Sequence, residues 1–111
     1  MDFNIVSLEI ADHIAHFDYY DNLISARGSK DTGFDEEQTK IRNKSQEHLA
    51  EFFAGTKFYN AKKQILPLSQ MSSLITSKLE GTKPKDIHAL VEKLEKDAKK
   101  IKKLYKALAE K

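Results

Sequence analysis

One side of the first predicted helix carries residue types that could bind a metal ion. These residues are spaced three and four positions apart, so on a helix they share one face: Glu9, Asp12, His13 and His16. Imidazole and carboxylate groups on bundle helices can hold iron, manganese or zinc. A complete site would also need ligands from a facing helix, and His48 with Glu51 could supply them.

More ordinary roles account for the same residues. His13 lies among the apolar positions of its helix, where a neutral, hydrogen-bonded histidine is common. Asp12 can pair with His16, and Glu9 with His13, for a few tenths of a kcal/mol each. Di-iron bundles use a Glu-x-x-His segment on each of two helices, and the chain lacks that pair. We therefore predict no metal and no cofactor, and retain one alternative set of ligands: Glu9, His13, His16, His48 and Glu51.

A second group of reactive residues lies in the segment RNKSQEH, residues 42–48. This segment resembles the Arg-x4–6-His signature of the HEPN superfamily of small helical ribonucleases and their inactive relatives. The resemblance implies that Arg42 stabilises phosphate charge and that His48 acts as an acid or base at a dimer cleft. On a regular helix these two side chains do not share a face, so a common site needs a bend. From the residues themselves we predict no catalytic group, with Arg42 and His48 as the alternative.

The most regular element that could position such groups is at the C-terminal end. Apolar residues recur there at alternating steps of four and three over KPKDIHALVEKLEKDAKKIKKLYKALAEK: Ile87, Val91, Leu94, Ala98, Ile101, Tyr105 and Leu108. This heptad pattern predicts a helix over about 84–110, roughly 40 Å long. Pro84 suits the first turn of a helix, and the lysines near the C-terminal end suit its dipole.

Three further helices are predicted upstream. An apolar face from Phe3 to Ile24 predicts a helix over about 3–25, and Gly28 and Gly33 then interrupt it. Acidic residues after Phe34 predict a second helix over about 35–54. We expect a third over about 67–80, although Pro67 could begin that helix or kink a longer one.

Helices joined by short connections bury their apolar faces against one another. The sequence therefore predicts a single all-α domain over residues 1–111, an antiparallel three- or four-helix bundle with a long C-terminal heptad helix. Alternation of apolar and polar residues at a period of two is absent, which argues against strands.

Composition limits the classes of protein that the chain can belong to. In 111 residues there is no cysteine, which excludes disulfides and thiolate metal sites. No apolar run is long enough to span a bilayer, and the N-terminus lacks the basic region of a secretory signal. We expect a cytoplasmic protein that does not enter membranes.

The small net charge of +2 conceals a strong asymmetry along the chain. Residues 1–55 carry five basic and eleven acidic side chains, whereas residues 56–111 carry fourteen basic and six acidic ones. The two halves can neutralise each other in the fold. Alternatively, the lysine-rich end attracts nucleic acid, although its lack of arginine favours diffuse attraction over readout of bases.

These observations favour a non-enzymatic helical interaction module: an adaptor, a chaperone-like protein, an antitoxin or immunity protein, or an assembly subunit. The long C-terminal helix should extend past its neighbours and leave part of its apolar seam for another protein, or for a second copy in a homodimer. The residues predicted to bind that partner are Val91, Leu94, Ile101, Tyr105 and Leu108. The alternatives are the HEPN-like ribonuclease and a nucleic-acid binder with a basic face.

Overall fold

The structure is a computed structural model, and it describes residues 2–27, 32–53 and 75–110. Three long helices occupy most of these ranges: α1 (Phe3–Arg27), α2 (Thr32–Phe52) and α5 (Pro84–Ala109). Residues 75–79 are also helical, and no residue in the described ranges belongs to a strand. The predicted all-α helical bundle is confirmed.

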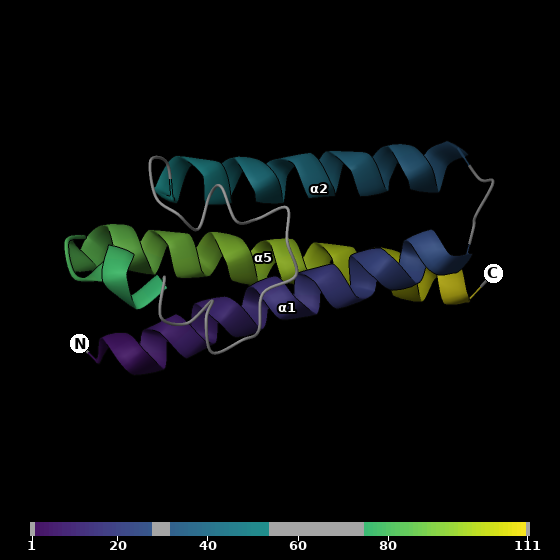
Figure 1. Ribbon diagram of the computed structural model, residues 1–111. Helices are drawn as coiled ribbons and strands as arrows, with labels where there is room; N and C mark the ends of the chain where they lie inside the picture. The colour runs from purple at the N-terminus through teal and green to yellow at the C-terminus, as the bar shows by residue number, and fades with distance from the viewer. Residues whose placement is uncertain (1, 28–31, 54–74, 111) are drawn as a thin grey trace.

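Helix α5 packs against both of the other long helices (Figure 1). Along the bundle α2 runs opposite to α1 and α5, so α1 and α5 are parallel to each other (Figure 1). The C-terminal end of α5 therefore lies at the same end of the bundle as the C-terminal end of α1. This arrangement lets α5 divide its apolar stripe between two partners.

The boundaries of the long helices follow local signals. Pro84 occupies the first turn of α5, where its missing N–H has no intrahelical acceptor to lose, and Asp86 places negative charge at that positive end. Helix α2 begins at Thr32, three residues before the expected start near residue 35. Gly33 therefore lies within the first turn of α2 and does not separate two helices.

The predicted third helix can be followed only at its end. Pro67 and residues 67–74 lie outside the described residues. After residues 75–79 the chain turns, and the backbone N–H of Thr82 donates to the carbonyl of Leu79 at 3.0 Å. The Thr82 hydroxyl also donates to the carbonyl of Lys78 at 2.7 Å. Thr82 thus donates to two of the carbonyls at the end of this helix, and Gly81 lies within the turn.

Two apolar clusters form the core, one toward each end of the bundle. The first joins α1, α2, α5 and residues 75–79, and its largest buried members are Ile10, Phe53, Ile75, Leu79 and Ile87. The second joins the C-terminal half of α1, the N-terminal half of α2 and the C-terminal half of α5 through Phe17, Ile24, Ile41, Ile101 and Leu108. Helix α5 contributes to both clusters, so its stripe links the two halves of the core.

Truncating a fully buried side chain of α5 tests this core. Ile101 has no exposed surface, so Ile101→Ala should lower the free energy of unfolding by about 2–5 kcal/mol. Lys103→Ala, on the exposed side of the same helix, should change it by no more than about 0.5 kcal/mol. Chemical denaturation measures both values. An Ile101→Ala protein that kept its stability but changed its oligomeric state would place this residue in a contact between chains.

Candidate functional site

The residues of the alternative metal site do not come together. His13 lies 3.8 Å from Glu9, measured from Nε2 to Oε1, and that nitrogen is buried with no hydrogen-bond partner. His16 is exposed, whereas His48 lies at the contact between α2 and α5. Across residues 2–27, 32–53 and 75–110, no three His, Asp or Glu side chains are grouped so that they could hold a metal ion.

The Glu9–His13 pair was predicted from spacing, and the structure has it. The predicted Asp12–His16 pair is not among the ion pairs of the described residues. Near His13, the carboxyl of Glu95 is paired with Lys99 at 3.0 Å, and this contact lowers the pKa of Glu95. Both side chains of this pair are exposed to solvent and lie one turn apart on α5, so the ion pair contributes little to stability or to a binding site.

Arg42 is engaged by helix α1. Its Nε lies 3.1 Å from Oδ2 of Asp21, and its Nη2 lies 3.0 Å from Oδ1, a two-pronged contact that suits the planar guanidinium. The amide of buried Gln38 donates to the same carboxylate at 2.9 Å. Together these contacts fix the register of α2 against α1.

His48 is engaged by helix α5 instead. Its Nδ1 lies 2.7 Å from Oδ2 of Asp97, and the two side chains are only 12% and 4% exposed. Asp97 would be costly to bury without this partner, because a buried carboxylate loses its hydration. Arg42 and His48 thus point to different helices and are held by different carboxylates, so they form no shared site within one chain.

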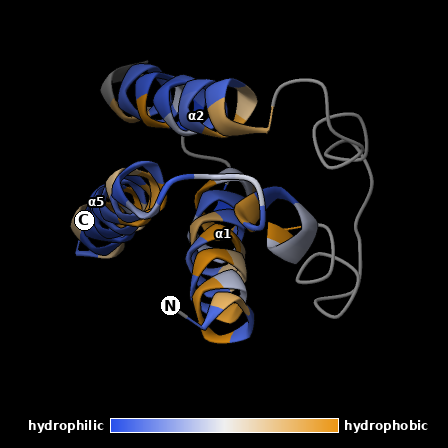
Figure 2. Cartoon of the chain, turned by 90° about the vertical axis from the view of Figure 1, so that its left-hand side faces the viewer, coloured by the Kyte–Doolittle hydropathy of each residue, from blue (hydrophilic) through white to orange (hydrophobic). Residues whose placement is uncertain are grey.

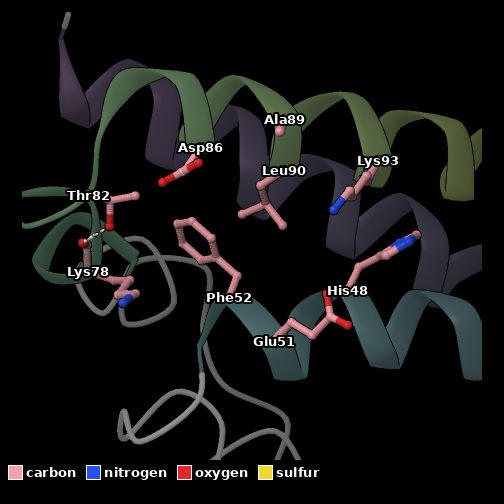
Figure 3. A pocket seen from close by; sticks show the side chains of 9 residues that line it. All are labelled: His48, Glu51, Phe52, Lys78, Thr82, Asp86, Ala89, Leu90 and Lys93. Atoms are coloured by element: carbon pink, nitrogen blue, oxygen red, sulfur yellow. Dashed lines mark hydrogen bonds between the residues drawn. The ribbon is translucent and has the colours of Figure 1, made fainter.

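An open groove of about 390 Å³ lies beside His48, between the end of α2, the start of α5 and the turn that precedes α5 (Figure 3). It is lined by His48, Glu51, Phe52, Lys78, Thr82, Asp86, Ala89, Leu90 and Lys93. The ammonium of Lys78 sits over the ring of Phe52, 5.6 Å from its centre. The described residues of the lining carry both signs of charge, and the hydroxyl of Thr82 donates to a backbone carbonyl. Among the described residues of the lining, no group is therefore prepared to act as a nucleophile.

The residues predicted to bind a partner on α5 lie in the core. Leu94, Ile101 and Leu108 are at most 7% exposed, and Val91 and Tyr105 pack against the two core clusters. This corrects the expectation of an uncovered seam, which assumed that the neighbours of α5 are too short. In the structure α1 and α2 are nearly as long as α5, at 25 and 21 residues against 26, and both pack against it.

The exposed apolar surface lies on α1 instead. Among the described residues the large hydrophobic side chains that are exposed are Ile5, Leu8 and Tyr19, at 64%, 51% and 58%, and all belong to this helix. With exposed Asp12 and Ala15 they repeat at steps of three and four. We call these five residues the outer row of α1. In the view of Figure 2, hydrophobic residues are more frequent along α1 than along α2 or α5.

Sequence reasoning missed the outer row because it assigned a single apolar face to α1. The signal was nevertheless present, since Ile5, Leu8, Ala15 and Tyr19 form a second heptad series beside the buried one. A helix with apolar residues on two faces needs two partners. Within the described residues, only one of these faces is covered.

Comparison with known proteins does not identify the chain: no family model matches it, and neither curated proteins nor solved structures give a significant match. None of the helices in the described ranges has a stretch that is long and apolar enough to cross a membrane.

The His48–Asp97 contact can be tested by a double-mutant cycle. His48→Leu leaves the buried carboxylate of Asp97 without its partner, so the free energy of unfolding should fall by about 3 kcal/mol. Adding Asp97→Leu removes the charge as well and should restore at least half of that loss. Urea denaturation of the two single variants and the double variant measures the coupling. Purely additive effects would show that the two side chains do not depend on each other.

Proposed function

We propose that the protein is a non-enzymatic helical interaction module that binds another protein through the outer row of α1. The observation that carries this proposal is the concentration of exposed large hydrophobic side chains, Ile5, Leu8 and Tyr19, on one face of one helix. Clustered apolar surface of this kind is typical of protein contacts, whereas single exposed hydrophobic residues need no explanation.

The geometry elsewhere gives less support to catalysis. Arg42 and His48 are each paired with a carboxylate that also serves the packing of the helices. Among the described residues, the lining of the groove beside Phe52 includes no activated nucleophile, and no group of His, Asp or Glu side chains there could hold a metal ion. We further propose a cytoplasmic location, because a chain of 111 residues without cysteine suits a reducing compartment.

A second candidate function rests on the solvent side of α5. Eight lysines are exposed there: Lys85, Lys93, Lys96, Lys99, Lys100, Lys102, Lys103 and Lys106. They form a basic surface suited to diffuse attraction of nucleic acid. Tyr105, the one aromatic residue of α5, is partly buried against the core, so it is poorly placed to stack on bases.

The second candidate function predicts that the affinity for nucleic acid depends strongly on salt. Binding of duplex DNA or RNA through lysines alone should be weak, indifferent to sequence, and reduced by at least about a hundredfold between 50 and 200 mM salt. Fluorescence anisotropy with labelled duplexes measures it. Retention of tight binding at the higher salt concentration would favour nucleic acid as the main ligand.

The main proposal predicts which surface captures partners. With the tagged protein as bait in native extract, wild type should retain specific proteins, and Ile5→Ser/Leu8→Ser should lose them at least tenfold. Both side chains are exposed, so this double variant should keep its thermal stability. Glu92→Ser, on the exposed side of α5, provides the matched control. Equal capture by all three proteins would rule out the outer row.

A further inference from the structure

The outer row contains one charged residue, and its position is informative. Asp12 is the third of five residues, with Ile5 and Leu8 before it and Ala15 and Tyr19 after it. It is exposed, and it takes part in none of the ion pairs found within the described ranges. A polar residue within an apolar stripe fixes which helix can pair with it and in which register.

A central acid disfavours pairing between two copies of α1. In a parallel pair each residue of the row faces its own counterpart, so Asp12 faces Asp12. Two carboxylates in an apolar contact repel each other strongly. In an antiparallel pair the two heptad positions of the row face each other, so Asp12 lies against Leu8 or Ala15 of the other copy and meets no basic residue. Shifting the register would bury Asp12 against Ile5, Leu8 or Tyr19 without a partner, which is also costly.

The remaining charges of α1 favour a basic partner. Glu9 and Asp18 are exposed beside the row, and Arg27 at the end of the helix is the only lysine or arginine of α1. The row from Ile5 to Tyr19 spans about 21 Å, the length of roughly four helical turns. A short amphipathic helix with basic residues would therefore match this surface in shape and in charge.

We propose that the outer row of α1 binds an amphipathic helix of a different protein, and that this helix carries a lysine or arginine within its apolar stripe, opposite Asp12. This inference rests on the proposed interaction function and specifies its partner class. The apolar residues supply the attraction, and the Asp12 contact selects the partner and its register. The same residue keeps the protein from pairing with itself through α1.

The first test uses two synthetic helical peptides of 21 residues that differ at one position. Both carry leucines in a heptad stripe, and the central stripe position is lysine in one and glutamate in the other. Wild type should bind the lysine peptide in the micromolar range and at least tenfold more tightly than the glutamate peptide. Asp12→Lys should reverse the order. Fluorescence anisotropy at 150 mM salt gives the four dissociation constants.

The outcomes separate this inference from the proposed function. Equal binding of both peptides, lost in Ile5→Ser/Leu8→Ser, would overturn the role of Asp12 and leave the outer row as a binding surface. Failure of both peptides to bind, together with unchanged capture from extract by Ile5→Ser/Leu8→Ser, would overturn both proposals.

The second test asks whether Asp12 prevents self-pairing. Asp12→Leu completes the apolar row, so this variant should dimerise at concentrations where wild type sediments as a monomer. Adding Leu8→Ser should return it to a monomer, and Glu92→Leu on α5 should stay monomeric as the matched control. Sedimentation velocity measures the mass of each. Wild type that dimerises through α1, or an Asp12→Leu variant that stays monomeric, would overturn the proposal.

Discussion

The fold depends on the need of α5 to bury an apolar stripe that runs along its length and packs against both α1 and α2. Residues of this stripe enter both core clusters, with Ile87, Leu90 and Leu94 in one and Ile101 and Leu108 in the other. Helix α5 therefore packs against α1 and α2 together (Figure 1). Burial of apolar side chains is the main favourable term in folding, so the other contacts of the structure are arranged around this helix.

Polar contacts make the packing specific. Arg42 and Gln38 join α2 to Asp21 of α1, and His48 joins the same helix to Asp97 of α5. Each contact satisfies a group that would otherwise be buried without a partner, so a shift of α2 along the bundle would leave several charges unpaired. The two residues that resemble a ribonuclease signature are accounted for by this structural role. They hold helices, and the recognition surface that we propose lies on α1.

That surface follows from the unequal use of the helices. The large apolar residues of α5 are buried or partly buried, and most of its exposed residues are charged. Helix α1 has apolar residues on a second side, where Ile5, Leu8 and Tyr19 remain exposed at some cost in solubility. We infer that this cost is retained for binding, with Asp12 limiting the partners that can use the row.

Local signals in the sequence were enough to predict the all-α class and the approximate extent of the long helices: heptad spacing and Pro84 for α5, and acidic residues near the start of α2. The sequence also showed which residues of α5 are apolar, but it did not show that they are buried within the chain. Which apolar faces are covered within one chain became known from the packing of the helices. The structure moved the candidate binding surface from Leu94 and Ile101 to Ile5 and Leu8. Whether an apolar face is buried depends on how the helices pack against one another. The structure also paired His48 with Asp97, 49 residues apart, a contact that no local spacing predicts.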